Sequence, residues 1–414
     1  MRKTLLMLII FLPVLSFCQE ISLQNLIDES IKNNPQIKVK KEIIDVLKIR
    51  VQKSASLEEP KIGFGLTNVP TNSFSLIDED MTMTELKLMQ MFPFPGKLSL
   101  RESIANYNLQ IAEEEYKEKV NEIKAQIKKS YYELFFLDKA ISITNQNKLI
   151  LRSFIDITSA KYKAEAGLKS DILRANVEVS KMSSELLMLA QKKETAKAKL
   201  NALLYSSVEI PVEDLEIKKT TTVLEFEKLK DIAIKLNPIL KSLELKLEQN
   251  KVMRELSTKE LLPDFDLGIS YGIRGGSPTG MQRSNTLSFM VSLNLPFLWG
   301  KAGYEVKENE IESKVISSEY DNVKNEIFFM IKDSLAEIQK SRSNLELYET
   351  IVIPQAKENV ESAVANYRSN KIDFLTMLDS QMTLYKYEIE LLKELVEHES
   401  KIAELERIIG GEIK

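Results

Sequence analysis

The chain is poor in the residues that most enzyme and metal sites need. It has one cysteine, Cys18, and one histidine, His398. If Cys18 is removed with a leader, the mature chain has no thiol, which excludes disulfides, thiolate metal sites and cysteine nucleophiles. One histidine cannot form an imidazole cluster, and we expect it to be a solvated residue of a coiled coil. No nucleophile motif or phosphate-binding loop stands out, so the sequence predicts no enzyme, no cofactor and no metal site.

Long apolar runs are also missing once the first 18 residues are passed. Arg2 and Lys3 precede a largely apolar run over residues 5–15, which is followed closely by Cys18. This pattern is typical of a signal peptide over residues 1–18; in an alternative interpretation Cys18 is kept and lipidated. Both interpretations export the chain. No later run reaches the ~18–20 apolar residues of a membrane-spanning helix, so a membrane crossing would have to use strands.

The charges do not point to nucleic acid. Lys and Arg together number 57, Asp and Glu together number 61, and the formal net charge is −4. The two signs are interspersed, so no basic patch is available for a phosphate backbone. Nucleic acid is therefore not an expected partner.

Glycine and proline are scarce, and several of them recur at a fixed spacing of 203 residues. LIDESIKNNP at Leu26–Pro35 returns as LKDIAIKLNP at Leu229–Pro238. Three further residues recur at the same spacing: Pro60 at Pro263, Gly65 at Gly268 and Pro93 at Pro296. Such a repeat indicates a tandem duplication. We expect one unit over residues 19–210 and a second over residues 211–414.

Each unit contains two segments in which apolar residues alternate with small or polar ones. The alternation predicts strands at about residues 61–68 and 83–92 in the first unit, and 264–274 and 286–295 in the second. One apolar and one polar face over about ten residues are typical of transmembrane barrel strands. A half-buried hairpin on a soluble core is the alternative.

The polar faces of these strands would line the interior of a barrel. The candidate lumen-facing residues are Glu85, Lys87, Asp266 and Arg274. Four strands cannot close a barrel around a usable pore, and an open sheet edge is not tolerated in lipid. The chain would therefore have to oligomerise.

Helical signal fills most of each unit. We expect long helical hairpins at about residues 97–205 and 301–410. Neither glycine nor proline occurs from Lys97 to Ala164, so an unbroken helix there would reach roughly 100 Å at ~1.5 Å per residue. Apolar residues of the returning segment are spaced three and four apart: Leu375, Leu378, Met382, Tyr385, Ile389, Leu392 and Val396. This is the heptad pattern of a coiled coil, and it predicts a mainly α protein with a small β portion.

Two turns join the long helical segments, AGLKSDILRA at Ala166–Ala175 and SNKIDFLTMLDSQ at Ser369–Gln381. Gly167 and Asn370 tolerate the left-handed conformation that ends a helix. Ser170 or Asp171 in the first turn, and Asp373 in the second, can cap the helix that follows.

With these features the chain resembles the TolC-like outer-membrane efflux proteins over essentially the whole mature length. The most specific matches are the two turns, and the segment MFPFPGK at Met91–Lys97 resembles the heavy-metal branch of the family. The resemblance implies a homotrimer in which duplicated units of antiparallel coiled-coil helices and four transmembrane strands per protomer complete a 12-stranded barrel and a periplasmic α-barrel.

The resemblance also implies a function and a location. The expected function is a passive conduit in the outer membrane, extending into the periplasm, that exports small molecules or metal cations. Its expected partners are outer-membrane lipid, a periplasmic adaptor and an inner-membrane pump. Two alternatives are an exported coiled-coil protein of the cell envelope and the outer-membrane component of a type I protein secretion system.

Family members have acidic side chains at the periplasmic constriction, and the matching residues here are Asp373, Asp379 and Asp171. Threefold symmetry would make each a ring of carboxylates that favours cations; the alternative is that they only cap helices or face solvent. The resemblance places adaptor docking at the turns, on Gly167, Leu168, Ser170, Asn370 and Ile372.

Overall fold

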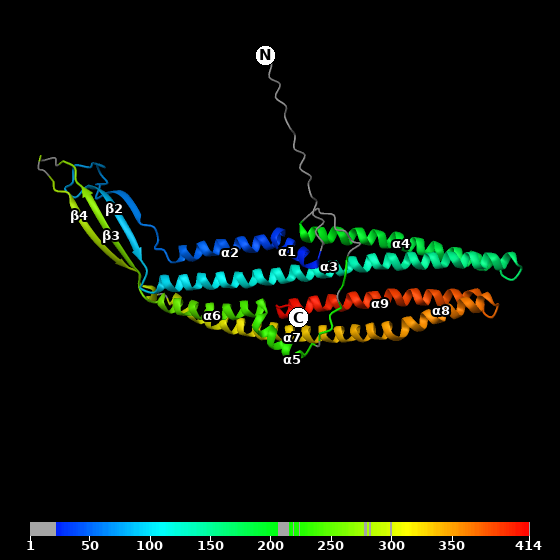
Figure 1. Cartoon of the computed structure of the whole chain (residues 1–414). Helices are drawn as coiled ribbons and strands as arrows, with labels where there is room; N and C mark the ends of the chain where they lie inside the picture. The colour runs from blue at the N-terminus through cyan, green and yellow to red at the C-terminus, as the bar shows by residue number, and fades with distance from the viewer. Residues whose placement is uncertain are drawn as a thin grey trace, which may run out of the picture. The chain divides into compact units, whose positions relative to one another are not determined.

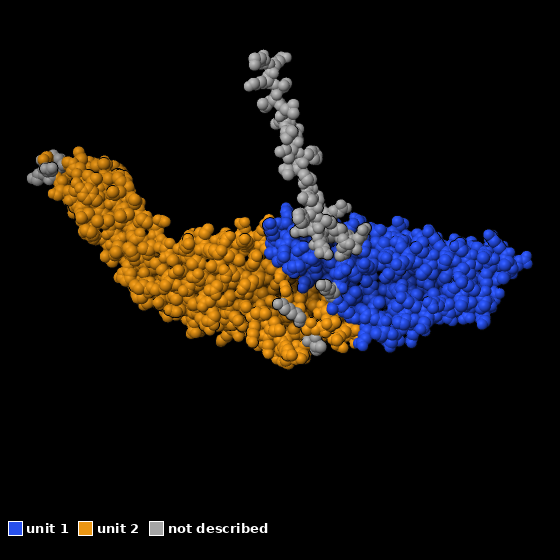
Figure 2. All heavy atoms as spheres, viewed as in Figure 1, with its two compact units in different colours: residues 1–33, 126–219, 345–396 blue, residues 34–125, 220–344, 397–414 orange. Residues whose placement is uncertain are grey.

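The computed structural model describes residues 22–205, 215–217, 219–222, 224–276, 280, 283–298 and 300–413. The predicted signal peptide, with Cys18, lies outside the described residues, as does the predicted boundary between the two units. The chain divides into two compact units (Figure 2), the first formed by residues 1–33, 126–219 and 345–396 and the second by residues 34–125, 220–344 and 397–414. Each compact unit therefore combines segments from both predicted copies.

Long helices account for most of the chain (Figure 1). The first copy contributes α3 (Lys97–Lys163) and α4 (Lys169–Leu204), and the second contributes α7 (Lys301–Leu347), α8 (Ile353–Arg368) and α9 (Phe374–Ile409). A π-helical turn at Tyr348–Val352 separates α7 from α8. Pro354 is the second residue of α8. Because proline has no N–H and its ring clashes with the preceding turn, the regular hydrogen-bond ladder is interrupted there. Among the described helices, none is long and apolar enough to cross a membrane.

Shorter helices precede each pair of strands. They are α1 (Leu23–Asn33) and α2 (Pro35–Ser54) in the first copy, and α5 (Phe226–Leu236) and α6 (Pro238–Lys259) in the second. The repeated Asn-Pro pair explains both breaks. The Asn34 side chain accepts a hydrogen bond from the Gln36 N–H at 2.9 Å, and Asn237 accepts from the N–H groups of Ile239 and Leu240 at 2.9 and 3.0 Å. Proline suits the next position, where no N–H is required.

The strands form one antiparallel sheet within the second compact unit. β1 (Lys61–Thr67) pairs with β2 (Met83–Phe92), β2 with β3 (Phe265–Ile273), and β3 with β4 (Thr286–Leu293). The central pairing of β2 with β3 joins the two copies. The sheet and the long helices confirm the predicted fold class, a mainly helical protein with a small β portion.

Each compact unit has its own apolar core. In the first, Leu151, Phe154, Ala175, Met182, Phe374 and Met377 belong to one buried cluster. In the second, Leu229, Leu240, Ile327, Ile331, Leu405 and Ile409 do the same. The period-3.6 spacing of these residues along their helices is what turns them to one side.

The end of α9 is fixed against the start of α6. Gly410 has φ +73°, and a Cβ atom there would lie 2.6 Å from the carbonyl oxygen of Leu236. The side-chain amide of Asn237 donates to the carbonyl of Ile408 at 2.7 Å. A glycine is therefore needed at position 410 for both backbone conformation and space.

The prediction that His398 is solvated is wrong, because its side chain is 1% exposed. Its Nδ1 lies 3.2 Å from the Ser341 hydroxyl, and its Nε2 lies 3.2 Å from the carbonyl oxygen of Thr220. Glu399 holds the same segment, accepting hydrogen bonds from the N–H and hydroxyl of Thr220 at 2.7 and 2.9 Å. The segment around Thr220 covers α9 here, which the heptad pattern alone does not reveal.

Candidate functional site

One face of the sheet carries apolar side chains in continuous rows across all four strands. The cross-strand register aligns Phe64, Leu86, Tyr271 and Leu287 in one row and Ile62, Leu88, Ile269 and Phe289 in the next. The exposed fractions of these eight residues run from 39% to 77%. An apolar surface of this extent on a soluble protein would be unusual, whereas strands that face lipid require it.

The opposite face carries mostly small or polar side chains in the same register, with Met89 and Met290 on either side of Gly268 as apolar exceptions. Gly63, Lys87, Ser270 and Ser288 form one row, and Gly65, Glu85, Gly272 and Thr286 form the next. The Lys87 ammonium lies 2.9 Å from a Glu85 carboxylate oxygen. Asp266, opposite Met91 and Ser292, lies on this face as well.

Arg274 differs from the other three candidates because it lies one residue beyond β3, which ends at Ile273. Its backbone N–H donates to the side-chain oxygen of Asn285 at 3.2 Å. Glu85, Lys87 and Asp266 are therefore brought to one face, and Arg274 stands at the end of the strand.

Lys97 at the first residue of α3 is a buried charge that sequence reasoning missed. Its side chain is 0% exposed, and its ammonium donates to Asp264 Oδ1 at 2.8 Å and to the Leu262 carbonyl at 2.9 Å. The Phe94 N–H also donates to Asp264 Oδ1, at 2.7 Å. Burial alone would raise the pKa of Asp264, but the hydrogen bonds from Lys97 and Phe94 and the nearby positive charges lower it.

The repeated Gly-Lys pair is a sequence signal that points to Lys97, because the pair stands at the start of both α3 and α7. Gly96 has φ +93° and Gly300 has φ +65°, so glycine supplies the left-handed residue that precedes both helices. The partner of the lysine could not be read from this motif, because Asp264 lies in the other copy.

The two helical turns share one backbone pattern. At the first turn the N–H groups of Glu165 and Ala166 donate to the carbonyls of Tyr162 and Lys161 at 3.0 and 2.9 Å. At the second turn the N–H groups of Asn370 and Lys371 donate to Tyr367 and Asn366 at 3.1 and 2.9 Å. This is the Schellman pattern, which requires one left-handed residue.

Asn370 fills that left-handed position with φ +61°, as predicted, but the prediction for Gly167 is wrong. Glu165, with φ +59°, is the left-handed residue of the first turn. Gly167 instead approaches the end of α3, where an added Cβ would lie 3.1 Å from Lys161 Cβ and 3.3 Å from the Tyr162 nitrogen. Glycine at position 167 therefore leaves room for the end of α3 and does not provide a left-handed backbone.

Asp373 caps α9, as predicted. Its Oδ1 accepts from the Thr376 N–H at 2.8 Å and from the Thr376 hydroxyl at 2.6 Å. These two hydrogen bonds, with the charge of Arg174, lower the pKa of the Asp373 carboxyl. The carboxylate is therefore ionised across the physiological range.

The prediction that Ser170 or Asp171 caps α4 is wrong. α4 begins at Lys169, and its N-cap residue is Leu168, which has no side chain that can accept. Ser170 and Asp171 consequently lie inside the first turn, where the Asp171 charge interacts favourably with the helix dipole. Burial, together with the charge of Asp171, raises the pKa of Tyr367.

The turns leave the remaining predicted residues accessible. Leu168 is 67% exposed, Ser170, Asn370 and Asp379 are exposed, and Gly167 and Ile372 are half-buried. Beneath them, the Tyr367 ring packs against Phe374 with centroids 5.9 Å apart, and the Lys161 ammonium lies 4.0 Å from the Tyr367 ring centroid. A buried aromatic pair thus supports an exposed polar turn.

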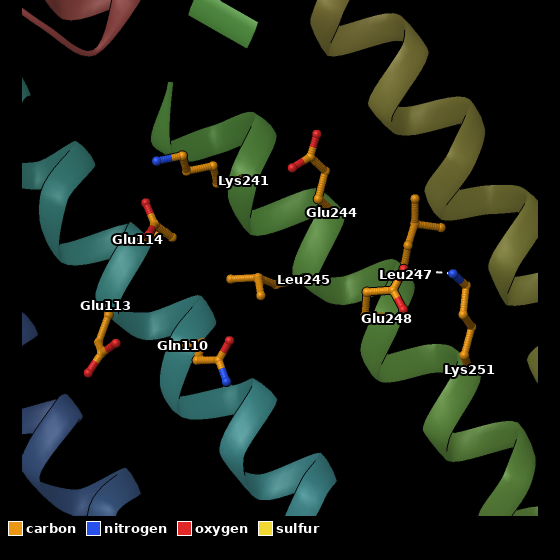
Figure 3. Close-up of a pocket in the computed structure, with 9 residues that line it drawn as sticks. All are labelled: Gln110, Glu113, Glu114, Lys241, Glu244, Leu245, Leu247, Glu248 and Lys251. Atoms are coloured by element: carbon orange, nitrogen blue, oxygen red, sulfur yellow. Dashed lines mark hydrogen bonds and ion pairs between the residues drawn. The ribbon is translucent and has the colours of Figure 1, made fainter. Parts of the chain in front are cut away.

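A groove lies between α3 and α6 in the second compact unit (Figure 3). Its volume is about 620 Å³, and Gln110, Glu113 and Glu114 of α3 face residues 241–251 of α6 across it. Its described lining contains glutamate, glutamine, lysine and leucine only, with no histidine, cysteine, serine or threonine. Among the described residues, no group of three or more His, Cys, Asp or Glu side chains could hold a metal ion.

Comparison with known proteins finds a family match for part of the chain. Residues 229–411 match the family model described as outer membrane efflux protein. The predicted resemblance to outer-membrane efflux proteins is confirmed. The match runs through the second copy, from α5 to the residues that follow α9. No curated protein matches the chain.

The fold of most of the chain is similar to that of solved outer-membrane proteins. OprN, an outer-membrane channel, has a TM-score of 0.78 and 16% identity, with 94% of this chain and 90% of that chain covered. CusC, whose structures concern transmembrane channel formation, has a TM-score of 0.78 and 15% identity, covering 94% and 92%. VceC of Vibrio cholerae has a TM-score of 0.76 and 16% identity, covering 95% and 97%. The family and these neighbours are channel proteins and not enzymes.

Proposed function

We propose that this chain is the outer-membrane channel of a tripartite efflux system. The observation that carries the proposal is the continuous apolar face of the four-stranded sheet, exposed along every strand. In lipid such a face is stabilising, whereas in water it would promote aggregation. The polar face with Glu85, Lys87 and Asp266 would then line an aqueous lumen.

The proposed channel is an oligomer, because a single sheet ends in two open edges, at β1 and β4; the resemblance to the efflux proteins makes it a homotrimer. Open edges are not tolerated in lipid, so other copies must pair with them. The 203-residue repeat gives β4 the place of β2, and β1 the place of β3. Moving the β2–β3 register by this spacing sets Val291 opposite Leu66 of a neighbouring copy, and Leu293 opposite Phe64. All four belong to the apolar face, and a slip of two residues would preserve this match.

The channel would extend into the periplasm as a helical barrel and receive cargo from an adaptor and an inner-membrane pump. The exposed turn residues Gly167, Leu168, Ser170, Asn370 and Ile372 would contact the adaptor. Asp373, Asp379 and Asp171 would form the constriction, where rings of carboxylates favour cations. Small molecules or metal cations would be the cargo, and the Met91–Lys97 segment favours cations only slightly.

Reconstitution tests the proposal directly. Protein purified in detergent should have the mass of a trimer and should give single-channel conductance in a planar bilayer. A water-soluble monomer without conductance would overturn the channel function. The family match of the second copy would then have to reflect the fold alone.

The acidic constriction needs variants that separate charge from helix capping. Asp373→Ala with Asp379→Ala should raise basal conductance at low ionic strength, because screening is weakest there. Asp373→Ser with Asp379→Asn is the matched control for folding, since serine keeps an N-cap acceptor without the charge. Unchanged conductance and cation preference in both double variants would refute the gating role.

Adaptor docking has its own variant. Gly167→Pro should weaken adaptor binding in a pull-down while membrane insertion stays intact, because residue 167 lies far along the chain from the strands. Normal efflux and normal binding by this variant would count against docking at the first turn.

A further inference from the structure

The two Gly-Lys helix starts have the same sequence and opposite surroundings. Lys97 is fully buried against residues 260–264. Lys301, which opens α7 in the same way, has a side chain that is 85% exposed, and its ammonium lies 3.5 Å from Glu305 one turn later. Both lysines belong to the second compact unit, so the contrast is internal to it.

The same contrast continues along the two helices. Near its start α3 buries Leu100 and Ile111, which are 9% and 8% exposed. The residues 204 positions later, Tyr304 and Val315 of α7, are 75% and 58% exposed, and Ile311 between them is 54% exposed. α7 thus has an apolar stripe at the heptad positions that are covered in α3.

Helix α6 is one neighbour of α3, and another is α2, whose Lys40 pairs with Glu115 of α3 at 2.6 Å. The two helices lie side by side in Figure 3, and the Gln249 side chain donates to the Ile104 carbonyl at 3.1 Å. By the repeat, the partner of α7 should be the counterpart of α6 in the first copy, which is α2. Helix α2 has an open apolar groove of about 590 Å³, with Val39, Ile43 and Val46 in its lining. These three residues are 57%, 40% and 48% exposed.

The charges beyond α2 complete the match. Lys97 of the first copy meets Glu260 and Asp264 of the second copy, which stand on either side of Leu261-Leu262. In the first copy the acidic and apolar positions are exchanged. Glu58 and Glu59 occupy the positions of Leu261 and Leu262, and Leu57 and Lys61 occupy the positions of Glu260 and Asp264. Residues 58 and 59 are exposed, so two carboxylates are available at the place where a neighbouring lysine would arrive.

We propose that α7 of one protomer lies on α2 of the neighbouring protomer, as α3 lies on α6 within one chain. Lys301 then pairs with Glu58 and Glu59 of that neighbouring protomer. A second protomer of this chain would cover both exposed surfaces. Each protomer carries the apolar stripe on α7 and the apolar groove on α2, and it carries the opposite charges of Lys301 and of Glu58 and Glu59. Apolar contact supplies most of the stability, and the ion pair fixes the register. The inference rests on the proposed function, since it requires the copies to assemble.

Engineered disulfides test the contact in the full-length protein with Cys18→Ser as background. Lys301→Cys combined with Glu59→Cys should give covalent dimers and trimers on oxidation in native membranes. Lys301→Cys with Glu79→Cys, in the loop between β1 and β2, is the matched control and should stay monomeric on a denaturing gel. Trimers that resist cross-linking at 301 and 59 but still conduct would overturn this contact and leave the proposed function standing. Absence of any trimer and of conductance would overturn both.

Charge reversal gives a second readout that does not depend on cysteine chemistry. Lys301→Glu should weaken trimer assembly in detergent roughly fivefold to tenfold, and Glu58→Lys with Glu59→Lys should restore it. Ile311→Glu should weaken assembly at least as much while leaving the helical circular dichroism unchanged, because Ile311 is exposed in the single chain. Assembly that is insensitive to all three changes would contradict the proposed interface.

Discussion

The two copies of the repeated unit have the same order of helices and strands, but they have different residues at the ends and starts of their long helices. The left-handed residue after the returning helix is Tyr205 in the first copy and Gly410 in the second, with φ +50° and +73°. The residue before that helix is Leu168 in one copy and Asp373 in the other. The lysine that opens the first long helix is buried as Lys97 and exposed as Lys301.

These differences show that the helix bounds correspond in the two copies, whereas the helix caps and the partners of charged residues depend on the residues that surround each position. The residue before α4 is a leucine that offers no side-chain cap, since a helix draws most of its stability from the packing of its apolar face rather than from its cap. A buried lysine is stable only where carboxylates from the other copy meet it. Each pair of positions can therefore be tested by a matched pair of substitutions.

The largest expected difference lies between the two lysines. Lys97→Met should lower the free energy of unfolding by about 3 kcal/mol, because it leaves Asp264 partly buried without its cation. Lys301→Met should change the stability of the isolated chain by less than about 0.5 kcal/mol. Urea unfolding in detergent, followed by circular dichroism at a protein dilution where the trimer has dissociated, measures both. Equal effects would contradict the assignment of Lys97 as the buried partner of Asp264.

The next difference concerns the two helix ends. Gly410→Ala should cost about 2–3 kcal/mol, because alanine is strained at positive φ and its Cβ would collide with the Leu236 carbonyl. Tyr205→Gly should instead gain about 0.5–1 kcal/mol by relieving the left-handed strain. Thermal unfolding compares the two variants, and a loss of stability in Tyr205→Gly would show that the tyrosine makes an interaction of its own.

The two caps should differ by less. Asp373→Ala removes an N-cap and should lower the unfolding midpoint by about 1–3 °C, whereas Leu168→Asp adds one and should raise it by a similar amount. The same Leu168→Asp change should weaken adaptor binding, since it removes exposed apolar surface from the proposed docking turn. A Leu168→Asp variant that has a lower unfolding midpoint and normal adaptor binding would contradict both expectations.

The smallest expected effect is the pH dependence of the second cap. The pKa of Asp373 is lowered in the folded chain by hydrogen bonds from Thr376, so its contribution to stability is present above the unfolded value of about 3.9 and is lost as the pH falls through the folded value. The midpoints of the parent chain and Asp373→Ala should therefore converge below about pH 4. A gap that persists at pH 2 would mean that the carboxyl charge is not what stabilises the cap.

Much of the fold could be predicted from the sequence because it depends on local patterns. Alternation over Phe265–Ile273 predicts a strand with one apolar face, and the run without glycine or proline from Lys97 to Ala164 predicts the long helix α3. Asn370 and Asp373 were also predicted correctly, since their roles depend on residues within one turn of the chain. Each of these signals lies within one continuous segment of the chain.

The remaining features depend on partners far along the chain. The burial of Lys97 depends on Asp264, and that of His398 on Thr220, and neither contact leaves a local pattern. Glycine is the usual left-handed residue of such a turn, which predicts that role for Gly167, but the left-handed residue lies two positions earlier, at Glu165. The same shift places Asp171 inside α4 rather than before it.

The central claim is that the apolar rows of the sheet face lipid. Spin labels at Phe64, Ile269 and Phe289, and matched labels at Ser270 and Ser288 on the other face, can be measured in liposomes for collision with oxygen and with a water-soluble nickel complex. We predict high oxygen and low nickel accessibility for the first set, and the reverse for the second. If both sets are equally accessible to nickel, or if the first set is shielded from both reagents, the sheet does not stand in a membrane and the channel proposal is contradicted.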